Sequence, residues 1–225
     1  MITHDPTPSM TRTIARHPGR AGELALRERE GAYEIISNGV FLMDTRDGRS
    51  ERLLVRSALD LVVTSGPRHV LLGGLGVGFS LAEVLASPDV SEVVVVEWEP
   101  AVVDWSRTTV GVQTGGDLDD PRVRCELADL VAWLQRPSAE VFDAICLDVD
   151  NGPHWTVSPG NDWLYGNEGL ATIRDRLAVG GVLGVWSAEQ VPTFERRLQD
   201  RFREVRREEV PVARGAPDIV YLALG

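Results

Sequence analysis

Residues 68–85 constrain the fold of this chain more than any other stretch. A short apolar run at residues 70–72 is followed by a glycine-rich turn, and a helical pattern begins at Phe79. Three alternating positions of the turn are glycine: Gly74, Gly76 and Gly78. Glycine has no Cβ, so the backbone can turn sharply and a ligand can approach it closely. A buried strand, a glycine turn and a helix N-terminus are typical of a site for a nucleotide-like ligand, although such a turn also occurs without one.

A second strand signal follows at residues 92–97, where four consecutive valines stand between two glutamates. A continuous apolar run is typical of a parallel strand that is buried on both faces. Glu97 then lies at the C-terminal end of that strand, where an acidic side chain accepts hydrogen bonds from ribose hydroxyls in doubly wound folds. A solvated side chain is the alternative for Glu97 alone, but the glycine turn and the acid together indicate nucleotide-type binding.

Length and composition fit one α/β domain with a small appendage. The 225 residues carry a net charge of −11, and the pI is near 4.8, which argues against nucleic acid as a partner because phosphate binding needs a basic face. No apolar run approaches the roughly 18 residues of a membrane span, and the N-terminus lacks a signal-peptide core. We therefore expect a cytoplasmic protein. All 23 basic residues are arginine, which excludes a Schiff base on lysine.

Turn signals and changes in residue pattern divide the chain into three segments. Residues 1–20 show no periodicity and are predicted to be a mobile N-terminus. Residues 21–50 contain short alternating segments separated by Gly31 and by Asn38-Gly39, and Asn-Gly is the strongest two-residue hairpin signal. This segment predicts a small β-hairpin appendage, and residues 51–225 predict the α/β domain.

Within the domain, strand patterns alternate with helical patterns, as in a doubly wound sheet. Further strands are expected at residues 123–127, 141–147 and 182–186, and helices at 52–63, 100–109, 130–135, 164–178 and 194–200. Residues 202–210 and 218–224 predict a closing antiparallel pair. Residues 111–120 are expected to form a loop, and residues 149–162 are the best candidate for a loop that covers a site.

Four predicted strands end at a residue suited to a ligand site: Gly74, Glu97, Asp129 and Asp148. In open parallel sheets the ligand binds at the C-terminal ends of the strands, near the switch in strand order. Four such residues at four strand ends are a stronger signal than any single motif.

The glycine turn differs from the dinucleotide fingerprint, because Phe79 stands where that motif has a third glycine or alanine. Together, the glycine turn, Glu97 and the run at residues 142–148 resemble the corresponding segments of the spermidine synthase family of class I S-adenosylmethionine-dependent transferases. The resemblance extends from about residue 31 to the C-terminus. It implies a doubly wound, seven-stranded Rossmann-like sheet of order 3-2-1-4-5-7-6, with a small N-terminal β appendage that helps to form a homodimer.

The resemblance also implies a role for each cofactor-side residue. Gly74, Gly76 and Gly78 would cradle the methionine and ribose portions of S-adenosylmethionine or its decarboxylated form, and Glu97 would hold the ribose hydroxyls. Asp129 would meet the adenine amino group. Trp98 would lie against the adenine face, or serve only in packing.

Asp148 matches the first aspartate of the family's Asp-Ser-Ser-Asp-Pro motif, which lies beside the reactive carbon. Residues 148–153 are shorter and lack the serine pair, and Asp150 would stand in for the second aspartate. A sulfonium carbon is already electrophilic, so the protein needs to align a nucleophile and accommodate its proton, and no metal is required. The alternative role for Asp148 is a helix cap or a solvated loop residue.

The loop after Asp148 contains further candidates. His154 has the intrinsic pKa of a general base, or it is only polar cover. Three aromatic side chains would either form the wall of a pocket for an amine or aromatic acceptor or pack the loop against the domain: Trp155, Trp163 and Tyr165.

Departures from the family pattern fall on the acceptor side. The aspartate of the family's glycine loop is replaced by Gly76, its N-terminal glutamine appears as Leu42, and its Tyr-His-Glu signature is absent at residues 52–56. The sequence therefore predicts methyl transfer from S-adenosylmethionine to a small molecule. Aminopropyl transfer from the decarboxylated compound is the alternative, and a non-catalytic binding or dimerisation protein is a third possibility.

The two cysteines, Cys125 and Cys146, fall on strands three places apart in the strand order that the resemblance implies. At 4.8 Å per place the separation is about 14 Å, which is too far for a disulfide. We expect two free, mostly buried thiols.

Overall fold

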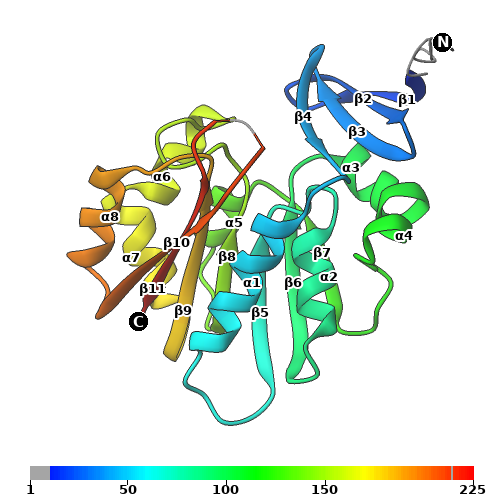
Figure 1. Ribbon diagram of the computed structural model, residues 1–225. Coiled ribbons are helices and arrows are strands. Elements are labelled where there is room, and N and C mark those ends of the chain that lie inside the picture. The colour runs from blue at the N-terminus through cyan, green and yellow to red at the C-terminus, as the bar shows by residue number, and fades with distance from the viewer. Residues whose placement is uncertain (1–10, 214) are drawn as a thin grey trace, which may run out of the picture. The chain divides into compact units, whose positions relative to one another are not determined.

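The computed structural model describes residues 11–213 and 215–225. The chain divides into two compact units, one that ends at Asp47 and one that begins at Gly48 (Figure 1). This division lies close to the boundary predicted between residues 50 and 51. No helix in the described part of the chain is long and apolar enough to cross a membrane.

The first unit is a four-stranded antiparallel sheet in the order β1-β2-β3-β4. Its strands are β1 (Thr11–Gly19), β2 (Gly22–Arg29), β3 (Ala32–Ser37) and β4 (Val40–Asp44). Both central residues of two turns have positive φ: 55° and 80° at Glu30 and Gly31, and 50° and 81° at Asn38 and Gly39. Hairpins with two-residue type I′ turns need this geometry, so the predicted Asn-Gly hairpin is confirmed.

The prediction of a mobile N-terminus is wrong for β1, and the part that concerns residues 1–10 lies outside the described residues. β1 pairs with β2 from Thr11 opposite Arg29 to Gly19 opposite Gly22. Its side chains are mostly exposed, so the strand forms through its hydrogen-bond ladder and shows no apolar alternation. An ion pair of 2.8 Å between Arg12 and Glu28 crosses the two strands.

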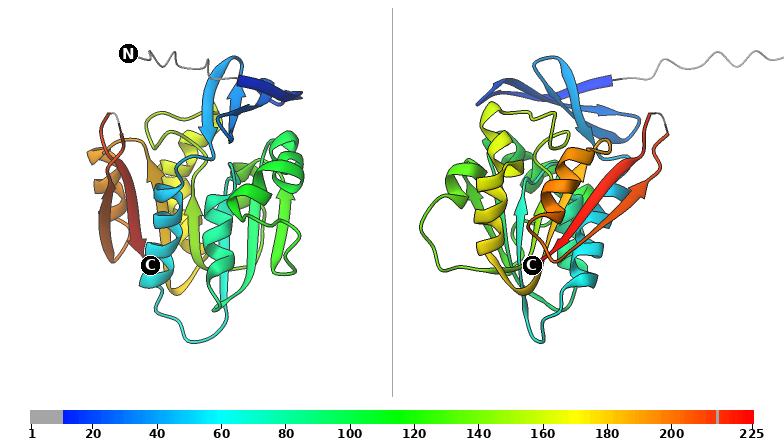
Figure 2. Two further views of the ribbon diagram at one scale, coloured as in Figure 1. Left: turned by 45° about the vertical axis from the view of Figure 1, so that its right-hand side comes forward. Right: turned by 90° about the vertical axis from the view of Figure 1, so that its left-hand side faces the viewer.

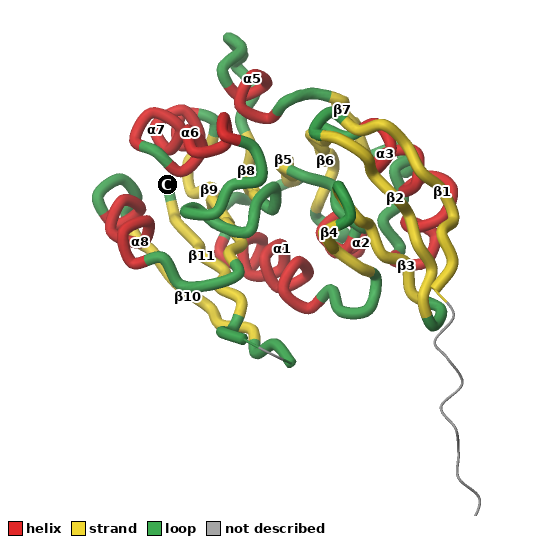
Figure 3. The backbone as a smooth tube through the Cα atoms, turned by 90° about the horizontal axis from the view of Figure 1, so that it is seen from above, coloured by secondary structure: helices red, strands yellow, loops and turns green. Residues whose placement is uncertain are grey.

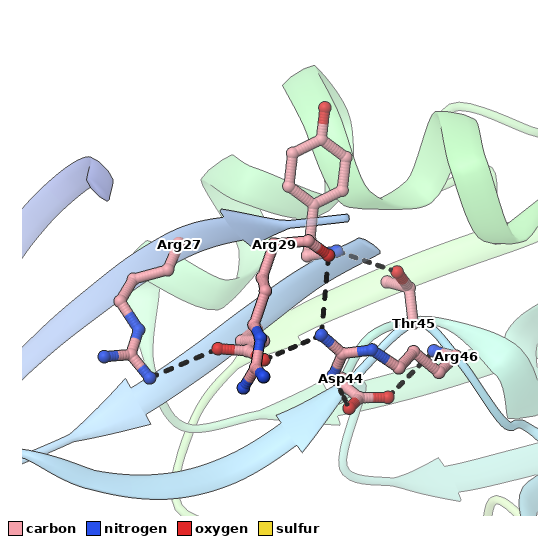
Figure 4. Close-up of polar contacts among 7 residues, drawn as sticks. Arg27, Arg29, Asp44, Thr45 and Arg46 are labelled. Carbon is pink, nitrogen blue, oxygen red and sulfur yellow. Dashed lines mark hydrogen bonds and ion pairs between the residues drawn. The ribbon is translucent and has the colours of Figure 1, made fainter. Parts of the chain in front are cut away.

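The buried Glu34 is the centre of a group of ion pairs at one end of this sheet, and Figure 4 shows Arg27, Asp44 and Arg46 of this group. Glu34 on β3 pairs with Arg27 at 3.2 Å and with Arg46 at 2.8 Å, and Arg46 also pairs with Asp44. Burial opposes ionisation of Glu34, but the two guanidinium groups lower its pKa overall. Glu34 is therefore a charged buried residue that is stabilised by its partners.

The second unit contains a seven-stranded sheet in the order β10-β11-β9-β8-β5-β6-β7. Its strands are β5 (Arg68–Gly73), β6 (Val90–Glu97), β7 (Val123–Leu127), β8 (Phe142–Leu147), β9 (Leu177–Ser187), β10 (Glu204–Val210) and β11 (Asp218–Leu224). The first five are parallel, and β11 pairs antiparallel with both β9 and β10. The predicted doubly wound fold, its strand order and the closing antiparallel pair are confirmed.

Helices cover both faces of this sheet (Figure 3). α1 (Arg49–Leu61) and α2 (Phe79–Ala86) lie on one face, and α5 (Leu130–Leu134), α6 (Asp162–Tyr165) and α7 (Asn167–Asp175) lie on the other. α8 (Pro192–Gln199) contributes Phe194 and Leu198 to the same apolar core as α5 and α7. The four consecutive valines of β6, residues 93–96, are at most 1% exposed, as a strand covered on both faces requires.

Two predicted boundaries are wrong. The predicted loop at residues 111–120 begins as helix: α3 (Pro100–Trp105) continues through a π-helical turn at Ser106–Val110 into α4 (Gly111–Thr114). A Cβ on Gly111 would lie 2.3 Å from the Ser106 carbonyl oxygen, so this glycine permits a close backbone contact rather than a loop. The helix predicted at 164–178 is divided at Gly166, and β9 begins at Leu177.

Candidate active site

The glycine turn has the conformation that its sequence predicts. Gly74, Gly76 and Gly78 have φ values of 94°, 54° and 93°, all in the left-handed region. A Cβ on Gly74 would lie 2.4 Å from the carbonyl oxygen of Asp148, so the turn packs directly against the end of β8. A side chain at Gly74 would push these two segments apart.

Glu97 connects the turn to the neighbouring strand. Its Oε2 accepts a hydrogen bond from the Leu75 N–H at 2.9 Å, and its Oε1 accepts one from the Glu99 N–H at 2.7 Å. The residue is 9% exposed. Burial raises the pKa of Glu97, although these N–H donors act in the opposite direction. Each carboxylate oxygen has more than one acceptor position, so Glu97 can hold the turn and still accept hydrogen bonds from a ligand.

The other two cofactor-side candidates lie close to Glu97. Asp129 is the N-cap of α5 and accepts a hydrogen bond from the Ala132 N–H at 2.8 Å. The backbone N–H of Ala128 donates to the Glu97 carbonyl at 3.0 Å. Trp98 is partly buried. The sheet therefore brings these residues to adjacent strand ends, while their roles toward a ligand stay predictions.

Asp148 follows β8 directly and is partly exposed. Its N–H donates to the Gly73 carbonyl at 2.9 Å, which fixes it beside the glycine turn. Burial raises the pKa of Asp148 to about 7, and the negative charges of Asp218 and Asp150 add to this effect. Asp148 therefore has the pKa of a group that can exchange a proton near neutral pH.

Asp150 is engaged by its own loop. It accepts hydrogen bonds from the Val157 N–H at 2.6 Å, the Asn161 amide at 2.9 Å and the Tyr165 hydroxyl at 2.9 Å. Burial raises its pKa, although these donors act in the opposite direction. The family resemblance suggested a chemical role for Asp150, which stays a prediction, and its contacts show that Asp150 also holds the segment up to Tyr165 in place.

The remaining loop candidates are divided between surface and core. His154 is exposed, and its Nε2 lies 2.8 Å from an Oε1 atom of Glu189. Trp155 is 62% exposed. Trp163 packs against the core, and the buried Tyr165 meets Phe194 edge-on, with ring centroids 5.7 Å apart. The packing alternative therefore describes Trp163 and Tyr165, and neither of these two rings is an open pocket wall.

Two residues near this edge were missed from the sequence: Trp186 on β9 and Asp218 on β11. Leu147 pairs in parallel with Val185, so the next residues, Asp148 and Trp186, follow at the same level. Trp186 pairs with Val220, which lies two residues after Asp218. Matched positions on neighbouring strands share one face of a sheet, so Asp148, Trp186 and Asp218 lie on the same face.

α1 covers that face. A Cβ on Gly184 of β9, which shares the face of Trp186, would lie 2.8 Å from Leu54 Cδ1. In the first turn of α1, the Ser50 hydroxyl donates to Asp218 Oδ2 at 2.5 Å. Asp218 could have been predicted from the sequence. It is the first residue of β11, which runs antiparallel to β9, so it lies at the edge of the sheet where the parallel strands end. Trp186 gave no signal beyond its place in an apolar run.

The site thus has two parts, both within the second unit. We call the ends of β5, β6 and β7 with the glycine turn the cofactor half, and the ends of β8, β9 and β11 with the start of α1 the acceptor half. Among the described residues, no group of three or more His, Cys, Asp or Glu side chains is arranged to hold a metal ion.

Comparison with known proteins finds similar sequences and similar structures. The family model described as "Spermine/spermidine synthase domain" matches residues 52–208. The polyamine aminopropyltransferase of Mycobacterium tuberculosis (strain CDC 1551 / Oshkosh) is 30% identical over 173 residues, which cover 76% of this chain and 32% of the relative. Putrescine N-methyltransferase 2 of Nicotiana attenuata is 32% identical over 117 residues, which cover 52% of this chain and 30% of the relative. The chain spans about a third of the length of these curated relatives.

Solved structures show the same fold. The spermidine synthase of Thermotoga maritima aligns with a TM-score of 0.76 at 20% identity, over 95% of this chain and 72% of the other. A spermidine synthase in complex with the transition state analogue AdoDATO aligns with a TM-score of 0.75, with the same identity and coverage.

Proposed function

Because the chain belongs to the spermine/spermidine synthase family, we propose that it is a transferase that moves a group from an S-adenosyl compound to a small amine. One observation carries the proposal: the buried Glu97 holds the glycine turn through the Leu75 N–H at 2.9 Å. A carboxylate in this position can accept ribose hydroxyls while the turn stays open. A structure of the same fold that was solved with AdoDATO supports this ligand class.

The residues of the cofactor half fit such a ligand. The turn presents three glycines, and no side chain projects from them into the space that a ligand would use. Glu97 is fixed by two backbone N–H groups, so it needs no reorganisation to accept a ligand hydroxyl. Asp129, at the end of the next strand, is the candidate acceptor for an adenine amino group.

We favour methyl transfer from intact S-adenosylmethionine over aminopropyl transfer. In the family pattern the aspartate of the glycine loop complements the bare ammonium of decarboxylated S-adenosylmethionine, and it would repel a carboxylate. Here Gly76 occupies that position, so the repulsive element is absent. The similarity to putrescine N-methyltransferases agrees with this choice, while the similarity to a polyamine aminopropyltransferase supports aminopropyl transfer as the second candidate. A ligand-binding protein without turnover is the alternative from another class.

The bound S-adenosyl compound would supply a sulfonium-activated carbon, and the acceptor half would supply alignment and a base. The acceptor nitrogen must be neutral to attack, so its proton needs a place to go. Asp148, with a pKa of about 7, can take that proton. As the new carbon–nitrogen bond forms, the carbon–sulfur bond breaks and its electron pair returns to sulfur.

Titration of S-adenosylmethionine and its decarboxylated form into the same preparation tests the proposal by calorimetry. We expect both to bind, and intact S-adenosylmethionine to bind at least as tightly. Binding of neither compound would refute the transferase proposal. A clear preference for the decarboxylated compound would keep it but replace methyl transfer with aminopropyl transfer.

A further inference from the structure

The start of α1 lies directly against the glycine turn of the cofactor half. A Cβ on Gly48, the N-cap of α1, would lie 2.2 Å from the Phe79 ring, and Phe79 is the first residue of α2 after Gly78. The Ser80 hydroxyl donates to the Glu51 carbonyl at 3.4 Å. The first turns of the two helices are therefore packed together at the edge of the sheet where the parallel strands end.

Arg52 extends from this part of α1 toward the same place. Its guanidinium carbon lies over the Phe79 ring, 5.1 Å from the ring centroid, and its Nη2 donates to the Thr114 carbonyl at 3.2 Å. Thr114 itself borders the glycine turn, because a Cβ on Gly78 would lie 3.0 Å from the Thr114 Oγ1. The contacts with Phe79 and Thr114 thus hold the Arg52 guanidinium beside the end of the turn.

The guanidinium of Arg52 keeps donors for a further partner. A guanidinium has several N–H donors, and among the described residues Arg52 uses them for the single hydrogen bond to Thr114. Its ion pair with Glu83 is 3.6 Å long, which is beyond hydrogen-bond distance. Glu83 instead accepts a hydrogen bond from the Arg56 Nε at 2.9 Å. The Arg52 side chain is 34% exposed, so a ligand can reach it.

The charge of Arg52 is opposite to that of the acids at the strand ends. The carboxylates of Glu97, Asp129 and Asp148 attract the sulfonium and ammonium groups of S-adenosylmethionine and repel its carboxylate. A guanidinium has the opposite preference, and its planar fork of donors matches a carboxylate in geometry. A zwitterionic tail that follows the glycine turn would therefore find acids for its positive groups and Arg52 for its negative group.

We propose that Arg52 is a specificity-determining residue of the cofactor half, and that its guanidinium binds the carboxylate of intact S-adenosylmethionine. Decarboxylated S-adenosylmethionine lacks that carboxylate and gains nothing from Arg52. Gly76 removes a repulsion and Arg52 adds an attraction, and discrimination between two ligands uses both. This inference rests on the proposed function, because it assumes an S-adenosyl ligand in the cofactor half.

Three adenosyl compounds with different tails test it: S-adenosylmethionine, its decarboxylated form, and 5′-methylthioadenosine, which has neither an ammonium nor a carboxylate. Each is titrated by calorimetry into the natural protein and into Arg52→Gln. We expect Arg52→Gln to weaken the binding of S-adenosylmethionine about 10-fold, because a charge-assisted pair is lost. The affinities for the other two compounds should change by less than about 2-fold, because neither has a partner for the guanidinium.

Arg56→Gln is the matched control. Arg56 lies one turn further along α1 and bonds to Glu83, so this variant loses the same charge but no contact with the glycine turn, and all three affinities should stay close to the natural values. If Arg52→Gln does not fold, Arg52→Lys takes its place, because lysine keeps the charge and lacks the fork. It should lower the preference for S-adenosylmethionine over the decarboxylated form about 3-fold.

A ratio of the two S-adenosyl affinities that the Arg52 variant leaves unchanged would overturn the inference alone. An equal loss of affinity for all three compounds would also overturn it, because that result would assign Arg52 to the shape of the turn. Failure of the natural protein to bind any of the three would overturn the proposed function as well.

Discussion

The two halves of the site differ in how their polar groups are satisfied. In the cofactor half, Glu97 accepts hydrogen bonds from two backbone N–H groups, and Asp129 accepts one from a third. In the acceptor half, burial and neighbouring carboxylates raise the pKa of Asp148 to about 7, and the Trp186 N–H has no partner among the described residues.

This difference agrees with the roles proposed for the two halves. A half whose groups are already held by backbone is pre-organised for a ligand of fixed shape. A half with a proton-exchanging acid is suited to a reacting partner, because that acid can take up the proton that the reaction releases. The sequence motifs mark the first half clearly and the second half poorly.

The largest expected effect is on turnover, at Asp148 in the acceptor half. Asp148→Asn should lower turnover by about 10²–10⁴-fold while S-adenosylmethionine binding is unchanged, because the amide cannot take the proton of the acceptor. Turnover of the natural protein should also rise as the pH increases through about 7, since Asp148 acts when deprotonated.

Asp143→Asn is a matched control for that experiment, because Asp143 lies at the other end of β8 and accepts the His69 N–H at 2.8 Å. Its turnover should stay close to that of the natural protein. Full turnover in Asp148→Asn would leave Asp148 as a structural residue and erase the proposed contrast between the halves.

The next effect is on cofactor affinity, at Glu97. Glu97→Gln should weaken S-adenosylmethionine binding by about 1–3 kcal/mol, because its amide group faces an N–H that needs an acceptor. Glu97→Ala should cost at least as much, since it releases both Leu75 and Glu99 and so loosens the turn itself. Calorimetry measures the S-adenosylmethionine affinity of both variants. Glu92→Gln, at the opposite end of β6, is the control.

Unchanged affinity in both Glu97 variants would remove Glu97 from the ribose role. A loss seen only in Glu97→Ala would assign it to the turn alone.

A smaller effect, on selectivity, is expected at Gly76. Gly76→Asp should shift the preference toward decarboxylated S-adenosylmethionine by about tenfold, since the new carboxylate attracts an ammonium and repels a carboxylate. The φ of 54° at Gly76 is one that aspartate tolerates better than most residues. A variant that folds and binds both compounds with the natural ratio would show that position 76 does not choose the cofactor.

The remaining effect is on stability rather than on turnover or binding. Asp148 has a raised pKa in the folded protein, so folding takes up a proton between the unfolded pKa near 4 and the folded pKa of about 7. Its contribution to stability is therefore fully present below about pH 4 and is lost as the pH rises through 7. Asp148→Asn should unfold at a higher temperature than the natural protein at pH 8, and the gap should narrow at pH 5. Equal midpoints at both pH values would contradict the raised pKa.

Local patterns were sufficient for the individual strands of the parallel sheet and for the glycine turn with Glu97, because these depend on residues close together in sequence. The strand order was predicted only through the family resemblance. β1 was missed because its mostly exposed side chains give no alternation, and α4 was missed because Gly111 looked like a loop signal.

The acceptor half depends on contacts that sequence spacing does not reveal. Asp150 meets donors up to fifteen positions away, and Ser50 meets Asp218 across most of the chain. Whether the Trp186 N–H has a hydrogen-bond partner depends on all the residues packed around it, so no sequence motif could have predicted it.

The placement of the two cysteines has a practical consequence. Both thiols are free as predicted, with Cys146 buried in the sheet and Cys125 half-buried on the edge strand β7. Burial raises the pKa of Cys146 to about 12, with a further contribution from the charge of Asp148. A thiol reagent should therefore modify Cys125 whenever the edge frays, but reach Cys146 only when the sheet opens. The rates of the two modifications would separate local fluctuation from global unfolding in the natural protein, without an introduced label.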